Sequence, residues 1–420
     1  MVLAAHVAVV CAAERDPNLD AWSATERALI DSMSIYQLGP PPPDPSNRYA
    51  ENPAAARLGE KIFNDPRFSV NGKISCSTCH RPDYHFTDPL PLAVGVGLNN
   101  RRTMPLIGSA YQRWFFWDGR KDSLWAQALE PLETPNEHGI SRTRVMQLIY
   151  KHYRSEYTSV FGALSHLRAS SLPAAARPYV AGTPAMVEWT SLPQELQSEI
   201  TRVFVNVGKS IAAFIRRLKP SPSDFDRYAR ALLSGDQVGF ANMTRQQTEG
   251  LRIFITKGKC INCHNGPLLT NGEFHHVGIA DDSRPDRGRA AVIDRIRASE
   301  FGYFSPWSDA DPEMDGPHVR FLNEVQSRYE RSFKTPSLRD VAVRPPYMHA
   351  GQFNTLHEVL RNYRKKSGSG AADEIFHGEL TDTELNHLVA FLRSLTSTNG
   401  EVVRSDDTVP LFADDRTLTR

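Results

Sequence analysis

Two pentapeptides of the same pattern carry the chain's clearest chemistry. Residues 76–80 read Cys-Ser-Thr-Cys-His and residues 260–264 read Cys-Ile-Asn-Cys-His. Two thiols three positions apart can form thioethers to the two vinyl groups of one porphyrin, and the adjacent histidine can bind its iron. The motifs predict two covalently bound haem c groups, held by Cys76, Cys79, His80, Cys260, Cys263 and His264.

Two other interpretations of paired cysteines fit less well. Structural zinc sites usually take four ligands from closely spaced pairs, whereas these pairs lie far apart and each has its own histidine. A thioredoxin-like pair should open a helix after a strand, and no such strand is evident.

Length and charge narrow the class of protein and partner. A chain of 420 residues can form two domains with substantial cores. Because 49 basic residues balance 48 acidic ones, the net charge of +1 gives no electrostatic case for nucleic acid or an anionic membrane.

The N-terminal segment, residues 1–18, contains an uncharged apolar run from Val2 to Ala13. This run is too short to span a bilayer and lacks a basic flank, so we interpret it as the remnant of a signal peptide. A lipoprotein with Cys11 as the lipidated residue is the alternative, although Val10 is bulkier than usual there. Because bacteria attach haem c outside the cytoplasm, the motifs themselves favour a periplasmic location.

Helical periodicity dominates the rest of the sequence. Helices are expected at 53–63, 123–132, 194–218 and 381–395, the last with a capping box of Thr381 and Glu384. The polar stretch 281–315 lacks periodicity and predicts a long loop. Since no long alternating β pattern occurs, we expect a mostly α fold of two cytochrome c-like haem domains with long loops.

Proline-rich stretches mark the expected domain boundaries. Residues 39–45 form a strap, and residues 219–223 separate a first haem domain at 46–218 from a second at 224–397. The polar tail at 398–420 is expected to be loosely held.

Further motifs carry a family resemblance. Residues 58–63 before the first haem motif echo 250–254 before the second, which suggests two related units. Together with the haem motifs, the stretches 116–120, 334–339 and 346–351 resemble the bacterial dihaem cytochrome c peroxidase and MauG superfamily over residues 52–396. Segments 113–120, 123–129 and 258–267 are most similar to its MbnH branch.

The resemblance implies unusual iron coordination at each haem. The removable histidine that the peroxidases place on the first haem falls at Val96, so peroxide could bind there without prior reduction. The methionine position at the second haem, fourteen residues after His349, is Tyr363. A phenolate favours ferric and higher states, so Tyr363 is the expected iron ligand. Met348, which adjoins the same motif, is the alternative.

The resemblance also implies catalytic roles. Trp117 matches a tryptophan between the haems and would relay electrons. Gln127, Pro131 and Glu137 fall at the distal side of the first haem, where Glu137 would act as acid and base for O–O cleavage. On residue type alone, Glu137 is an ordinary loop carboxylate, and the neighbouring His138 competes for the role.

Many relatives hold a calcium ion between the two domains through an asparagine side chain and two main-chain carbonyls. Those carbonyls would belong to Arg344 and Pro346, but the asparagine position is Arg102. A second cation beside Arg102 is unfavourable unless Asn99 or Asn100 substitutes, so the resemblance leaves Ca2+ open.

The resemblance implies an oxidoreductase that uses hydrogen peroxide to convert a tryptophan of an MbnP-like partner protein to kynurenine, through a high-valent state shared by both haems. Two alternatives remain. A cytochrome c peroxidase would draw electrons from a small redox protein, although Tyr363 and the missing histidine oppose it. A dihaem electron carrier would need both irons six-coordinate. No transmembrane segment is expected.

Overall fold

The computed structural model describes residues 16, 18–164, 171–178, 182–279, 285–365 and 380–397. The apolar N-terminal run and the polar tail lie outside these residues. The expected mostly α architecture is confirmed, and strands β1 (Phe274–His275) and β2 (Phe333–Lys334) form one short antiparallel pair. The helices are α1 (Ala24–Ser32), α2 (Pro53–Phe63), α3 (Cys76–Cys79), α4 (Leu124–Glu133), α5 (Arg142–His152), α6 (Arg154–Phe161), α7 (Pro184–Thr190), α8 (Gln194–Ile215), α9 (Asp224–Ser234), α10 (Arg245–Ile255), α11 (Pro317–Arg320), α12 (Leu356–Lys365) and α13 (Asp382–Ser394).

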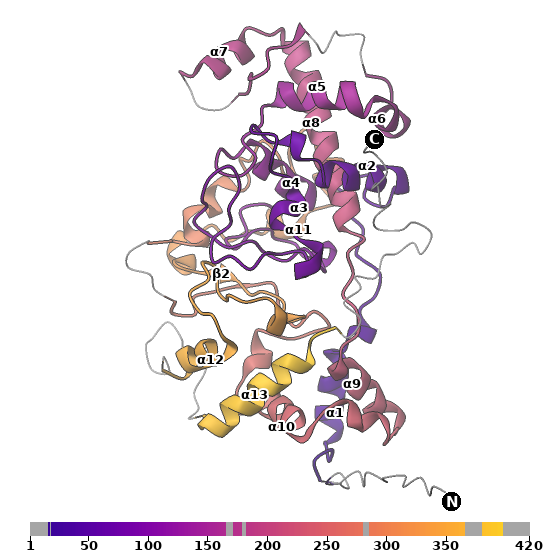
Figure 1. Ribbon diagram of the computed structural model, residues 1–420, viewed down its shortest axis with the longest axis vertical. Helices are drawn as coiled ribbons and strands as arrows, with labels where there is room; N and C mark the ends of the chain where they lie inside the picture. The colour runs from indigo at the N-terminus through magenta and orange to yellow at the C-terminus, as the bar shows by residue number, and fades with distance from the viewer. Residues whose placement is uncertain are drawn as a thin grey trace, which may run out of the picture.

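The first unit is built around the crossing of α2 and α8 (Figure 1). Helix α2 begins where the Asn52 side chain accepts hydrogen bonds from the backbone of Ala54 and Ala55. Its apolar face joins α4, α5 and α8 in one core. Gly59 makes the close crossing possible, because a methyl group there would collide with the carbonyl of Ser210 in α8.

The second unit repeats this crossing with α10 and α13. Gly250 in α10 has no room for a methyl group, which would collide with the carbonyl of His387 in α13. The echo between residues 58–63 and 250–254 therefore corresponds to equivalent helix crossings. The capping box that begins α13 is confirmed. The Glu384 carboxylate accepts a hydrogen bond from the Thr381 backbone N–H, and the Thr381 hydroxyl accepts one from the Glu384 backbone N–H.

The segment at residues 18–33 packs in the second unit, which the domain boundaries expected from the sequence did not anticipate. Trp22 and α1 lie against α9 (Figure 1). The Trp22 indole donates to the Tyr228 hydroxyl at 2.7 Å, and Tyr228 donates to Asp20 at 2.7 Å. The polar composition of residues 16–38 concealed this buried anchor.

The expected long loop at 281–315 is corrected in part. Among its described residues, short 3-10 turns form at Arg289–Ala291 and Ile293–Arg295. Phe301 then packs in the first core, at 6.3 Å from the Trp125 ring. The segment thus fastens the second unit to the first, because one large apolar side chain is buried across the boundary.

Two helix ends differ from expectation. The helix predicted at 123–132 spans Leu124–Glu133 and runs through Pro131 rather than ending there. The helix predicted at 194–218 ends at Ile215, three residues early. In the part of the chain that the structure describes, no helix is both long enough and apolar enough to cross a bilayer.

Candidate active site

Each haem motif lines its own large cavity. The first cavity is lined by Cys76, Cys79 and His80. The second is lined by the cysteines and histidine of residues 260–264. The wall of each cavity therefore holds the two thiols and the imidazole that attachment of one haem c requires.

The two motif histidines are oriented in the same way. The Nδ1 of His80 lies 3.1 Å from the carbonyl oxygen of Phe86, and that of His264 lies 3.0 Å from the carbonyl oxygen of Leu269. A bond of this kind fixes the ring and leaves Nε2 as the nitrogen for iron. Burial lowers the pKa of both imidazoles, to about 4 for His264, so they are neutral as ligation requires.

The alternative chemistries for the cysteines find no support among the described residues. Cys76, Cys79, Cys260 and Cys263 are free thiols, so neither pair forms the disulfide of a redox motif. No group of three or more histidine, cysteine or acidic side chains is placed there to hold a zinc ion. The donor set fits haem attachment.

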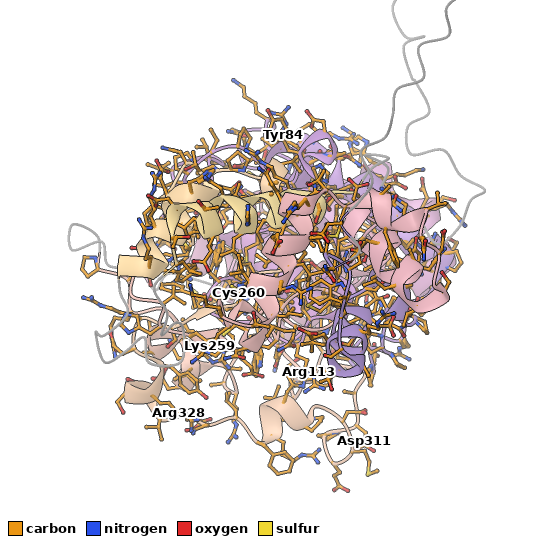
Figure 2. The ribbon with its side chains drawn as sticks, turned by 90° about the horizontal axis from the view of Figure 1, so that it is seen from below. Tyr84, Arg113, Lys259, Cys260, Asp311 and Arg328 are labelled. Carbon is orange, nitrogen blue, oxygen red and sulfur yellow. The ribbon has the colours of Figure 1, made fainter. Side chains whose placement is uncertain are left out.

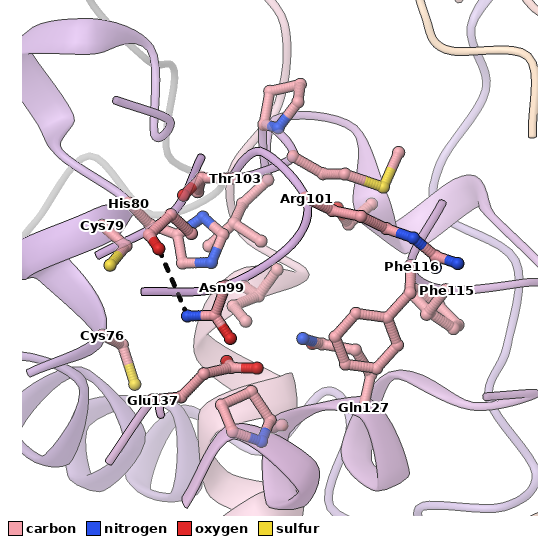
Figure 3. A pocket seen from close by; sticks show the side chains of 18 of the residues that line it. Cys76, Cys79, His80, Asn99, Arg101, Thr103, Phe115, Phe116, Gln127 and Glu137 are labelled. Atoms are coloured by element: carbon pink, nitrogen blue, oxygen red, sulfur yellow. Dashed lines mark hydrogen bonds between the residues drawn. The ribbon is translucent and has the colours of Figure 1, made fainter. Parts of the chain in front are cut away.

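The three predicted distal residues lie in the wall of the first cavity. Gln127 and Pro131 come from α4, and Glu137 comes from the loop after it. In Figure 3, His80 and Cys76 lie on one side of the cavity and Gln127 on the other, with Glu137 between them.

Glu137 is positioned by a neighbouring loop. The backbone of Val96 donates to the carbonyl of Glu137 at 2.8 Å, and that of Gly97 donates to Asn136 at 2.9 Å. Gly95 permits this approach, since a Cβ there would lie 2.7 Å from the Cα of Glu137. Burial raises the pKa of the Glu137 carboxyl to about 7.

The first cavity has no histidine in the peroxidase position. Val96 is 38% exposed and does not line the cavity. Among the described lining residues, the only histidine besides His80 is His138, whose Nδ1 lies 2.8 Å from the carbonyl oxygen of Phe68. Its Nε2 is 4.0 Å from the sulfur of Cys76, which holds the ring at the motif side of the pocket.

Trp117 belongs to the walls of both cavities. It is 8% exposed, and its indole nitrogen donates to the carbonyl of Arg102 at 2.9 Å. Lys334 also lines both cavities, which sequence reasoning missed. Its ammonium donates to the Trp114 carbonyl at 2.7 Å and to Gln112, and burial lowers its pKa to about 7. Its place at the start of the motif at residues 334–339 was the available signal.

Tyr363 on α12 lines the second cavity together with His264. Burial raises the pKa of its phenol. Met348 lines the same cavity, so lining alone does not separate the two candidate ligands. Met348 has φ +68° in a turn closed by Tyr347 and Phe353, just as Phe116 has φ +67° in a turn of the first unit.

The calcium ligands implied by the resemblance do not fit a metal ion in this structure. The Arg102 guanidinium donates to the carbonyl of Arg344 at 2.9 Å and to that of Pro346. Asn99 and Asn100, the possible substitutes, line the first cavity instead, where the Asn99 side chain donates to the Ala93 carbonyl at 3.3 Å (Figure 3). The two carbonyls therefore already hold a cation.

Comparisons with known proteins agree with this geometry. The family model described as di-haem cytochrome c peroxidase matches residues 53–233. The methylamine utilization protein MauG of Methylorubrum extorquens is 31% identical over 349 residues, covering 82% of this chain and 78% of that protein. Cytochrome-c peroxidase IdrP2 of Denitromonas iodatirespirans is 29% identical and covers 83% of each chain.

Solved structures show the same fold. A MauG-like protein associated with microbial copper homeostasis matches with a TM-score of 0.61 at 22% identity, over 90% of this chain and 97% of that one. The diheme peroxidase BthA of Burkholderia thailandensis matches with a TM-score of 0.60 at 20% identity, over 84% and 89%. Together with the relatives in sequence, they show that the chain is an oxidoreductase of the dihaem cytochrome c peroxidase and MauG family.

Proposed function

We propose that the protein is a hydrogen-peroxide-dependent enzyme, with two covalent haem c groups, that oxidises a tryptophan of a partner protein. The observation that carries this proposal is the open distal side of the first cavity, where Gln127 and Glu137 line the wall and Val96 lies outside it. When bound, the haems supply an iron that takes peroxide and two redox centres that hold its oxidising equivalents.

Glu137 would act as the acid and base. Cleavage of peroxide needs a group that takes a proton from the near oxygen and returns it to the leaving oxygen. A carboxyl group with a pKa of about 7 can do both near neutral pH. Gln127 in the same wall would orient the peroxide, and Pro131 would keep water out of the pocket.

Trp117 would pass electrons between the two cavities, since it lines both. One-electron oxidation makes an indole N–H strongly acidic. The partner of this N–H is the carbonyl oxygen of Arg102, which is too weak a base to remove the proton. The hydrogen bond therefore stabilises the protonated, oxidised ring, and its reduction needs no proton to return.

Tyr363 is the ligand we assign to the second iron. Tyr363 lines the second cavity together with His264, and it lies fourteen residues after His349, where the resemblance implies the ligand. An anionic oxygen ligand stabilises oxidised iron, so Tyr363 would suit a site that stores an oxidising equivalent.

The substrate class is supported by the resemblance to the MbnH branch, in which the enzyme converts a tryptophan of MbnP to kynurenine. Opening an indole ring to N-formylkynurenine removes four electrons, and two peroxide molecules can accept them as they form water. Hydrolysis then releases formate and leaves kynurenine. The protein would act in the periplasm, where haem c is attached and an exported partner is accessible.

The first test uses the protein matured in a host that assembles c-type haem. Electron paramagnetic resonance should show one high-spin and one low-spin ferric signal, and one equivalent of peroxide should abolish both without prior reduction. Mass spectrometry of an MbnP-like protein incubated with enzyme and peroxide should then show kynurenine in place of one tryptophan.

The competing function is a peroxidase supplied by a small electron donor, as the names of several relatives indicate. Two low-spin signals, with no reaction until one iron is reduced, would establish that function instead. Steady turnover with a reduced cytochrome, and no change in any partner tryptophan, would point the same way.

A further inference from the structure

Arg102 is a buried cation that forms no ion pair with a carboxylate among the described residues, although the charge of Asp88 acts on it and raises its pKa. It is 9% exposed, and its side chain donates to the backbone carbonyls of Arg344, Pro346 and Asp88. A buried guanidinium is normally paired with a carboxylate, because desolvation of its charge is costly. Arg101, its neighbour, follows that rule and pairs with Asp118 and Asp286 at 2.5 and 2.7 Å.

The carbonyls around Arg102 come from both units. Nη2 donates to the carbonyl of Asp88 at 2.9 Å in the first unit. Nη1 donates to the carbonyls of Arg344 and Pro346 in the second. The backbone N–H of Arg102 also donates to the carbonyl of His349 at 2.8 Å. One residue therefore binds the loop of the first cavity to the turn that lines the second.

The same residue holds the electron relay. The carbonyl of Arg102 accepts the indole N–H of Trp117, so any shift of this backbone moves the ring that lies between the two cavities. Carbonyl oxygens that converge on one point form a site for a hard cation such as Ca2+. Here the guanidinium lies at that point. Burial and nearby Arg344 lower its pKa to about 10, which still leaves it charged at neutral pH.

We infer that Arg102 is a built-in replacement for the cation between the two haem units, so that the site holds no calcium and Trp117 is positioned without any metal. A covalently attached charge cannot be removed by chelators or by dilution. The enzyme would thus keep its relay in place wherever calcium is scarce. The cation at this site does not depend on which substrate the enzyme oxidises.

The experiment compares the haem-loaded wild type with Arg102→Asn, which removes the guanidinium and supplies the amide oxygen that a calcium site lacks here. Arg328→Asn is the matched control, since Arg328 is exposed and lies at the edge of the molecule (Figure 2). Calcium content by mass spectrometry, the thermal unfolding midpoint and the ferric resonance signals are measured with the chelator EGTA and with added calcium.

The wild type and Arg328→Asn should contain no stoichiometric calcium, and neither EGTA nor calcium should alter them. Arg102→Asn in EGTA should unfold about 5 °C lower and show changed haem signals. Calcium at roughly 1 mM should restore both properties, because the carbonyls can then hold the ion. If calcium restores the stability and haem signals of Arg102→Asn, the defect is the loss of a cation. A general loss of packing would not be repaired by calcium.

Two results would overturn the inference. One is wild-type protein that carries one calcium ion per chain and loses stability in EGTA. The other is a folded Arg102→Asn protein that matches the wild type in EGTA. If the variant does not fold, the calcium content of the wild type still decides the matter.

Discussion

Replacing Glu137 by glutamine should slow the reaction with peroxide and remove its dependence on pH. Burial raises the pKa of Glu137 from its ordinary 4.5 to about 7, while Arg120 lowers it and Glu130 raises it. Only the ionised carboxylate can accept a proton from peroxide. Below pH 7 the wild-type rate should therefore fall about tenfold per pH unit, with a midpoint near 7.

The size of the effect follows from general acid–base catalysis, which contributes about 10²–10⁴-fold, or roughly 3–5 kcal/mol. The raised pKa of Glu137 affects rate and stability in opposite directions: the rate of the peroxide reaction rises with pH, whereas the stability of the fold falls. Because the folded protein holds the Glu137 proton up to a higher pH than the unfolded chain, its stability falls as pH rises from 4.5 to about 7. The loss approaches about 3 kcal/mol. Glu137→Gln should thus be slower than wild type, yet more stable at pH 9.

Stopped-flow absorbance with peroxide between pH 5 and 9, and chemical unfolding at pH 5 and pH 9, measure both effects. Glu130→Gln should move the wild-type midpoint below 7, since it removes a negative charge and releases Arg120, its partner at 2.5 Å. Glu313→Gln, at an exposed position, is the control. A Glu137→Gln rate within about threefold of wild type would refute the acid–base role.

Three further predictions follow from the cavities and the helix crossing. Trp117→Phe should leave the first reaction with peroxide intact but slow oxidation of the partner protein at least tenfold, and single-turnover kinetics that separate the two steps check it. Tyr363→Met should raise the reduction potential of the second haem in a redox titration, and an unchanged potential and spectrum would reject Tyr363 as ligand. Gly59→Ala should destabilise the protein by about 1–3 kcal/mol in chemical unfolding, because the methyl group meets Ser210, whereas Gly39→Ala, with open space around it, should not.

The sequence predicted the features that depend on local spacing. Two CxxCH motifs predicted one haem pocket in each unit, and each motif lines a large cavity. Helix α2 was predicted to the residue, because Pro53 starts it and a strong apolar face runs to Phe63. In contrast, α1 was missed, since its polar sequence gave no sign that Trp22 and Ile30 would be buried against α9.

The sequence could not predict how site residues that are far apart in the chain come together. Trp117 and Glu137 were identified by the resemblance to a known family. Hydrophobic periodicity gave no sign of either residue. Only folding showed that Trp117 lines both cavities and that Gly95 lets a loop hold Glu137 in place. The sequence showed Lys334 only as a charged residue in the motif at 334–339. Its ammonium is nevertheless buried between the cavities.

The sequence by itself predicted the haem-binding motifs, the helical class and the absence of histidine at Val96, since each depends on residue identity or on local spacing. Only the tertiary structure showed that the Arg102 guanidinium binds the two carbonyls that the resemblance implies for calcium. Arg102 is separated along the chain from Arg344 and Pro346 by 242 and 244 positions. Backbone carbonyls have no sequence signature, so their capture by a guanidinium becomes visible only when the two units pack together.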